Sequence, residues 1–132
     1  MRISSWALCM LMFCTTLQAQ QQLTYRNFNQ TLAALDSAIQ LNQYSKAFIV
    51  HFNFCSSTKY CGENLINFML RTKGDRILVV CENTDAKILA PLKTQSRFEF
   101  KAISNHTLTQ YGLFSVYNIL LNPRKKKIIK LQ

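Results

Sequence analysis

Two short, almost wholly apolar runs constrain the fold of this chain more than any other feature of its sequence. They are residues 47–54, Ala-Phe-Ile-Val-His-Phe-Asn-Phe, and residues 77–81, Ile-Leu-Val-Val-Cys. Both are rich in β-branched and aromatic residues, and neither alternates between apolar and polar positions. Such runs are typical of strands that are buried on both faces, as in a parallel sheet covered by helices. They therefore predict an α/β fold.

The segments around these runs complete the predicted order of elements. Helical spacing of apolar residues predicts helices over 27–43, 62–73 and 105–111, with Gly74 and Gly112 as stops after the last two. A further helix over 83–92 should kink or break at Pro91. Strands are predicted over 97–102, 116–121 and 126–131. The order α-β-α-β-α-β-α-β-β implies a central sheet, parallel where helices intervene, with an antiparallel final pair.

The amino terminus has the pattern of a secretory signal peptide. Arg2 precedes an apolar run from Trp6 to Cys14, and no charged residue occurs from position 3 to position 25. The run is short for a bilayer span, so we expect no transmembrane anchor after cleavage. Cleavage after Ala19 would divide the chain into a signal peptide, 1–19, and a single domain, 20–132. Such a protein is exported, and it is periplasmic or extracellular.

Cleavage would change the cysteine count. Of the 5 cysteines, Cys9 and Cys14 would leave with the signal peptide, while Cys55, Cys61 and Cys81 would remain. Three cysteines cannot form the disulfide framework of a small secreted scaffold, so the domain must rely on an ordinary apolar core.

Three stretches, taken in order, resemble the thioredoxin-like superfamily, and in particular its secreted TlpA and peroxiredoxin-like branch. They are 48–52 with the cysteine loop and helix that follow, 77–83 with the helix and strand up to Phe100, and 111–126, which includes an Asn-Pro turn. The resemblance implies a thioredoxin-like central mixed sheet, with a parallel core and a carboxy-terminal antiparallel hairpin, flanked by helices.

The active-site motif of this family is altered in the present chain. Members carry Cys-x-x-Cys at the start of the second helix, and the first thiolate attacks disulfides. Here Thr58-Lys-Tyr-Cys61 lies on the motif, so Thr58 takes the place of the nucleophile and Cys61 that of the resolving cysteine. A cis-proline is also expected before the strand that faces the motif, and Val116 or Tyr117 stands there. The resemblance therefore implies a degenerate active site.

The remaining thiols leave several interpretations open. Cys55 and Cys61 are either a non-standard redox pair, a structural disulfide or two unpaired thiols. Cys81 is either a buried apolar residue or a third thiol near Cys55, because the carboxyl ends of adjacent parallel strands share an edge. The three cysteines with His51 are the only candidate metal ligands, and their spacing matches no known site, so we expect no metal and no cofactor.

One dense basic patch falls on the last predicted turn and on the strand that follows it: Arg124, Lys125, Lys126, Lys127 and Lys130. Lysines on an edge strand commonly prevent unwanted strand pairing. The other positive charges are scattered, so we expect no nucleic-acid partner, although the formal net charge of +10 is suited to an acidic one.

Three hypotheses on function follow from the sequence. In the first, the protein is a non-catalytic binding module of the cell envelope, with another envelope protein as its partner. In the second, it is a thiol-disulfide oxidoreductase that uses Cys55 and Cys61. In the third, it is a basic adaptor for an acidic partner.

Overall fold

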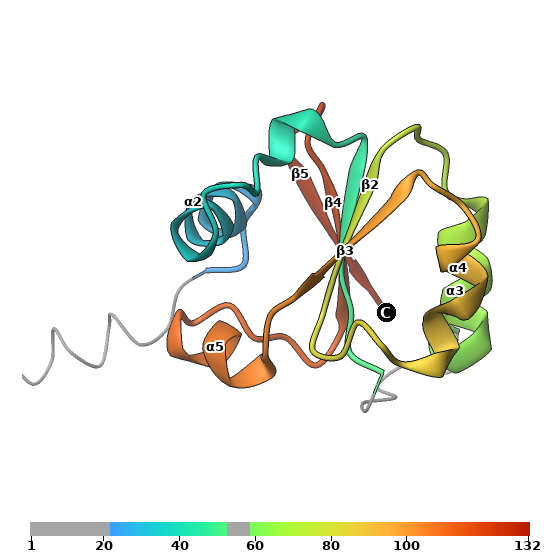
Figure 1. Cartoon of the computed structure of the whole chain (residues 1–132). Coiled ribbons are helices and arrows are strands. Elements are labelled where there is room, and N and C mark those ends of the chain that lie inside the picture. The colour runs from blue at the N-terminus through green and yellow to red at the C-terminus, as the bar shows by residue number, and fades with distance from the viewer. Residues whose placement is uncertain (1–21, 53–58) are drawn as a thin grey trace, which may run out of the picture.

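Five strands form one mixed sheet at the centre of the molecule (Figure 1). A computed structural model describes residues 22–52 and 59–132, so the predicted signal peptide, Cys55, Thr58 and the end of the first apolar run lie outside the described residues. The strand order is β3-β2-β1-β4-β5. The strands are β1 (Lys46–Ile49), β2 (Ile77–Cys81), β3 (Phe98–Ala102), β4 (Asn118–Asn122) and β5 (Lys127–Leu131).

Helices cover both faces of this sheet (Figure 1). One face carries α2 (Tyr25–Leu35) and α5 (Asn105–Gln110), and the other carries α3 (Gly62–Arg71) and α4 (Ala90–Lys93). Two single 3-10 turns, η1 (Leu41–Gln43) and η2 (Lys87–Leu89), precede β1 and α4. The predicted α/β class and its order of elements are therefore confirmed.

The core is split into two layers by the sheet because successive strand residues point to opposite faces. Phe48 and Val79 belong to the apolar cluster under α3 and α4, whereas Ile49 and Val80 belong to the cluster under α2 and α5. Both central strands are thus buried on both faces. This explains why their sequences are continuously apolar, as the prediction supposed.

The strand directions are parallel on one side of the sheet and antiparallel on the other. β1 pairs in parallel with β2, and β2 with β3. β4 runs antiparallel to both β1 and β5. The antiparallel final pair is confirmed, but the rule that strands are parallel wherever a helix intervenes is wrong for β4, which follows α5.

The place where β4 begins accounts for this exception. After β3 the chain passes through α5 without returning to the other end of the sheet. β4 starts at the end of the sheet where β3 finishes, and so it runs in the opposite direction.

The first helix is shorter than predicted because Asp36 ends it. α2 begins at Tyr25 with Thr24 as N-cap and stops at Leu35, although the apolar spacing continues to Ile39. The Asp36 carboxylate accepts a hydrogen bond from the backbone N–H of Ala38 and forms an ion pair with Lys101. A local side-chain bond of this kind competes with helical backbone bonds. Ile39 is buried all the same.

Other element boundaries shift by a few residues. α3 ends at Arg71 rather than Lys73, and Gly74 lies in the following loop. Pro91 lies in the first turn of α4, which follows the 3-10 turn η2 directly, so the predicted break into two turns is confirmed. α5 ends before Gly112, whose φ of 70° confirms it as a stop.

Different loops lie at the two ends of the sheet. Loops that contain Cys61 and the start of β4 lie at the carboxyl end of β1. The start of β1, the α3–β2 loop and the β4–β5 turn lie at the other. We call these the cysteine end and the basic end. No helix in the described part of the chain is long and apolar enough to cross a membrane.

Candidate functional site at the cysteine end

Cys61 lies at the start of α3, as the sequence predicted. It is the N-cap residue, with extended backbone angles of φ −132° and ψ 142°, and its side chain is half-buried. The next residue, Gly62, has a φ of 54°, which an L-residue adopts only with strain. Nothing lies within 4 Å of a Cβ built at this glycine, so the backbone angle, and not lack of space, favours glycine here.

Cys61 is disulfide-bonded, and its partner lies outside the described residues. The partner is not Cys81, whose thiol is free. At an α-helix N-terminus, unpaired backbone N–H groups and the helix dipole favour a negative charge, so the thiolate released by reduction would be stabilised there. The first turn of α3 also holds Glu63, whose carboxylate opposes that effect. The site therefore combines one favourable and one unfavourable electrostatic influence.

Asn118, a residue that the sequence analysis did not single out, connects the segments on either side of the cysteine loop. Its carboxamide oxygen accepts a hydrogen bond from the backbone N–H of His51 at 2.7 Å. Its carboxamide nitrogen donates to the backbone oxygen of Tyr60 at 3.2 Å. The Asn118 residue is only 5% exposed; its bond with His51 is buried, and its bond with Tyr60 is partly buried. Asn118 thus fixes the end of β1 and the entry to α3 against the start of β4.

Aromatic packing fixes the residue before Cys61. The Tyr60 ring meets the Phe68 ring edge to face, with centroids 5.1 Å apart, and Phe68 in turn meets Phe48 at 6.2 Å. Lys59 places its ammonium group 5.5 Å from the centre of the Tyr60 ring. Tyr60 and Phe68 also line a shallow hollow of about 360 Å³ along the outer side of α3. Its other lining residues are Lys59, Asn64, Asn67 and Arg71.

His51, a candidate metal ligand in the sequence, is a buried core histidine. Its side chain is 6% exposed, and its ring lies 5.1 Å from the ring of Phe114. Burial lowers the pKa of His51, and the Asn105 side chain and the charge of Glu82 only partly oppose this effect. The imidazole is therefore neutral at physiological pH.

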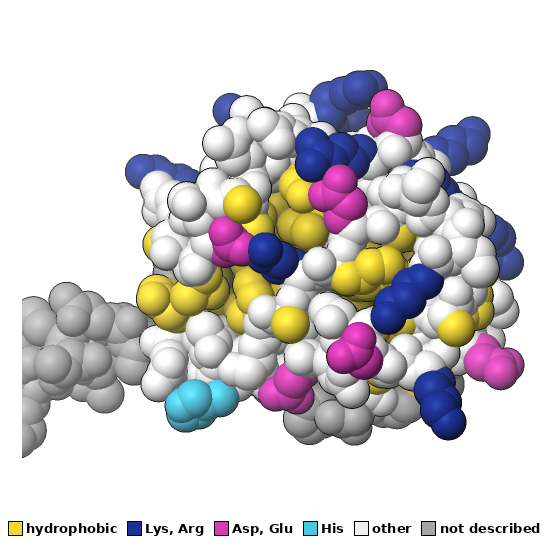
Figure 2. Space-filling model, viewed as in Figure 1, with side chains coloured by type: hydrophobic (Ala, Val, Ile, Leu, Met, Phe, Trp, Pro, Cys, Tyr) yellow, Lys and Arg dark blue, Asp and Glu magenta, His cyan; other side chains and the backbone are white. Residues whose placement is uncertain are grey.

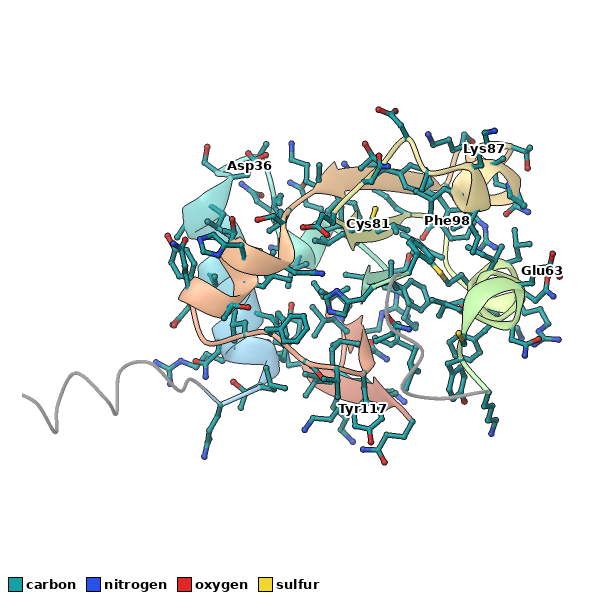
Figure 3. The ribbon with its side chains drawn as sticks, turned by 90° about the horizontal axis from the view of Figure 1, so that it is seen from below. Asp36, Glu63, Cys81, Lys87, Phe98 and Tyr117 are labelled. Atoms are coloured by element: carbon teal, nitrogen blue, oxygen red, sulfur yellow. The ribbon has the colours of Figure 1, made fainter. Side chains whose placement is uncertain are left out.

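Cys81 is buried in the apolar core, whereas its distance from Cys55 involves a residue outside the described part of the chain. It is the last residue of β2, it is 2% exposed, and it packs in the cluster under α3 and α4 (Figure 3). Burial raises the pKa of its thiol to about 11, although Lys93 has the opposite effect. A thiol of this kind is protonated at neutral pH and is neither a nucleophile nor a metal ligand.

Val116 and Tyr117 precede β4, close to the contact between Asn118 and Tyr60. The Val116 side chain is 52% exposed, and Tyr117 is half-buried (Figure 3). All peptide bonds within 22–52 and 59–132 are trans, including those at this position. The two residues therefore form part of the surface at the cysteine end.

The residues of the basic patch lie where the sequence placed them. Arg124, Lys125 and Lys126 form the β4–β5 turn, while Lys127 and Lys130 lie on β5, an outer strand of the sheet. All five side chains are exposed. The three turn residues and Lys127 lie at the basic end, whereas Lys130 pairs with Ile119 and therefore lies toward the cysteine end.

Among the residues that the structure describes, no group of three or more histidine, cysteine and acidic side chains is placed to bind a metal ion. Comparison of the chain with protein-family models, with curated proteins and with solved structures found no match.

Proposed function

We propose that this chain is an exported thioredoxin-like protein with a degenerate redox motif, and that it acts as a non-catalytic binding module of the cell envelope. Three strands in parallel, a carboxy-terminal antiparallel hairpin and a helix that begins at Cys61 support the resemblance. Signal-like residues 1–19 support export.

The threonine at position 58 carries the non-catalytic part of the proposal, and the burial of Cys81 removes one candidate for a second thiol. Dithiol exchange needs two thiols that alternate between a disulfide and a reduced pair. Cys81, which is 2% exposed with a pKa of about 11, cannot act as the second. Thr58 occupies the nucleophile's place in the motif, and a hydroxyl group does not replace a thiolate in disulfide exchange.

An insulin-reduction assay with dithiothreitol tests this function. We expect no turnover above the uncatalysed rate, and a disulfide at Cys61 with a reduction potential below about −300 mV, as in structural disulfides. The double variant Cys55→Ser/Thr58→Cys, which restores the motif of the family, should gain turnover. Turnover by the unmodified protein would contradict the non-catalytic role. An inactive double variant that folds and oxidises would contradict the alignment of Thr58 with the nucleophile.

Export is tested by sequencing the amino terminus of the protein recovered from cell fractions. We expect a mature chain that begins at Gln20 and is found outside the cytoplasm. An intact Met1 on soluble cytoplasmic protein would contradict export.

The position of Cys61 favours one alternative, a thiol-disulfide oxidoreductase that uses Cys55 and Cys61. A cysteine at a helix N-terminus, beside a hollow lined by amide and cationic side chains, is suited to exchange with a substrate disulfide. This alternative predicts a reduction potential between about −120 and −270 mV. It also predicts turnover that Cys61→Ser and Cys55→Ser abolish and that Cys81→Ser leaves intact.

A further inference from the structure

The basic end of the molecule contains a hollow of about 700 Å³. Lys and Arg side chains gather at this end, which is the upper end in Figure 2. The hollow opens between the start of β1, the α3–β2 loop and the β4–β5 turn. Four of its lining residues are cationic, and only Asp75 is acidic. Continuing along the turn to Lys127, the cations of this surface, which we call the basic rim, are Lys46, Lys73, Arg124, Lys125, Lys126 and Lys127.

The one carboxylate in the hollow is already engaged. Asp75 accepts a hydrogen bond from the Ser45 hydroxyl at 2.7 Å, and that bond lowers the pKa of Asp75. Ser45 is itself fixed, because its backbone N–H donates to the Arg76 oxygen at 2.7 Å. Gly74 packs so closely on Ser45 that a Cβ on Gly74 would lie 2.8 Å from the Ser45 Cβ. The wall of the hollow is therefore firmly built.

No cation of the basic rim forms an ion pair within residues 22–52 and 59–132. The ion pairs found there are Arg76 with Glu99 and Lys101 with Asp36, and no residue of the rim takes part in either. The charge of Arg124 does act on Asp75 and helps to lower its pKa, but four cations face this one carboxylate in the hollow. The rim thus carries a surplus of positive charge, which attracts anionic groups.

The backbone at Lys126 is a second indication. This residue has a φ of 52° and is the only residue other than glycine in the described part of the chain with a positive φ. The left-handed region is unfavourable for an L-residue, and glycine or asparagine usually occupies it. Glycine would suit the backbone of this turn better than lysine. A lysine in such a position is expected where its side chain has a functional role.

The adjoining strand offers backbone groups as well as charge. β5 is an outer strand of the sheet, Ile129 is 50% exposed, and the side chains of Lys127 and Lys130 point to solvent. Lysines on such a strand repel a second cationic edge, including that of another copy of this chain. The same lysines attract an extended segment that carries carboxylates, which can then add to the sheet as a further strand.

We infer that the basic rim and the edge of β5 bind an extended, acidic polypeptide segment. This inference rests on the proposed role as a binding module and names the chemistry of its partner. Single-stranded nucleic acid is disfavoured because the one aromatic ring in the hollow, Tyr44, is covered by the Arg76 guanidinium, 4.6 Å from its centre. A lipid surface is disfavoured because four of the cations surround a hollow rather than a flat or convex apolar face that could enter a membrane.

Fluorescence anisotropy with a labelled peptide of alternating glutamate and valine tests the inference. We expect saturable binding that weakens as salt is raised, and protection of β5 amides from hydrogen exchange in the complex. The double variant Lys73→Glu/Lys125→Glu should bind about tenfold more weakly or worse. Arg26→Glu/Lys87→Glu removes the same net charge from exposed positions outside the rim, and it should bind within about twofold of the unmodified protein.

Each other outcome contradicts the inference. Equal losses in the two double variants would show that net charge, and not the rim, governs binding. Stronger binding of a single-stranded oligonucleotide or of phosphatidylglycerol vesicles would assign the rim to a different partner. If the peptide does not bind, or binds without protecting the β5 amides, the proposal that it adds to the edge of β5 is wrong. The insulin-reduction assay is independent of all these results, so the failure of one proposal is distinguishable from the failure of the other.

Discussion

Asn118 is the residue on which the geometry of the cysteine end most depends. Replacing it with alanine would leave the backbone N–H of His51 and the backbone oxygen of Tyr60 without this hydrogen-bond partner. Each of these groups would be left in a poorly hydrated place, because the Asn118 side chain is buried.

We therefore expect Asn118→Ala to lower the free energy of unfolding by about 1–3 kcal/mol. Urea denaturation measures the change. Asn122→Ala, at the opposite end of β4, removes only an exposed 3.3 Å bond with the Lys125 N–H and should cost less than about 1 kcal/mol. Equal costs for the two variants would contradict the role given to Asn118.

Cys81 gives a prediction about chemical reactivity. Because it is 2% exposed and its pKa is about 11, its thiol should not react with Ellman's reagent in the native protein at pH 8. It should react fully once the protein is unfolded in guanidinium without reductant. Rapid reaction of the native protein, measured by absorbance and located by mass spectrometry, would show that the β2 end opens readily.

At the scale of elements, Arg97 is the residue that completes α3. Its guanidinium donates to the backbone oxygens of Leu70, Thr72 and Gly74, at 2.8, 2.6 and 3.0 Å. Helices end with carbonyl groups that lack partners within the helix, and a planar cation from the start of β3 satisfies them here. The contact also joins α3 to the sheet.

Arg97→Ala should destabilise the protein by about 1.5–3 kcal/mol, and Arg97→Lys should recover only part of that loss because lysine lacks the planar fork. Thermal and urea unfolding report the difference. Arg71→Ala, in the last turn of α3, removes the same charge from an exposed position and should change stability by less than about 0.5 kcal/mol. A similar loss in both variants would mean that charge near the helix end, rather than capping, matters.

The β4–β5 turn should be more stable with glycine at position 126. Lys126→Gly relieves a positive φ of 52° and should raise the free energy of unfolding by about 0.5–1 kcal/mol. If the basic rim binds acidic segments, the same change should weaken peptide binding. Lys130→Gly, on β5 and outside the turn, should instead destabilise the protein, because glycine weakens a strand interior. If Lys126→Gly is more stable but binds the peptide equally well, the Lys126 side chain has no role in binding.

At the scale of the whole molecule, a polar network joins η1, β2 and β3. Arg76 pairs with Glu99 at 2.9 Å, and the Tyr44 hydroxyl donates to the same carboxylate at 2.6 Å. These contacts, the Arg76 bond first, hold the pKa of Glu99 below its ordinary value of 4.5. Burial and the hydrogen bond with Glu99 raise the pKa of Tyr44 to about 12.

The signs of these shifts predict a plateau of stability. The Glu99 contribution is present above pH 4.5 and is lost as the pH falls through its lowered pKa, whereas that of Tyr44 is present below pH 10 and is lost as the pH rises toward 12. Glu99 is 42% exposed, so its share should be no more than about 1 kcal/mol. Urea unfolding of Glu99→Gln should show a weaker dependence on pH below 4.5, and an unchanged dependence would contradict this assignment.

Local sequence patterns predicted which helices and strands form, but not all of the residues at which they end. β2 coincides with the predicted run, 77–81, and Cys61 starts α3 as expected, because both depend on neighbouring residues. The helix over 27–43 was predicted too long because Asp36 has a local alternative to helical bonding that apolar spacing does not register.

The site was harder to predict because its contacts join distant parts of the chain. Asn118 meets His51 across 67 residues and Tyr60 across 58, and only the sheet order brings them together. The one local signal was a polar residue inside an apolar strand pattern. The hollow at the basic end likewise depends on Lys46, Lys73 and Arg124, which come from three separate segments.

The placement of the cysteine end and the basic end at opposite ends of one short sheet has a consequence for orientation. β1 runs from Lys46, which lines the basic hollow, toward Cys61, which caps α3 after it. An anionic support that holds the protein by its basic end would leave the disulfide pointing away from that support. Every copy would then expose its disulfide at Cys61 to the surrounding solution in the same orientation.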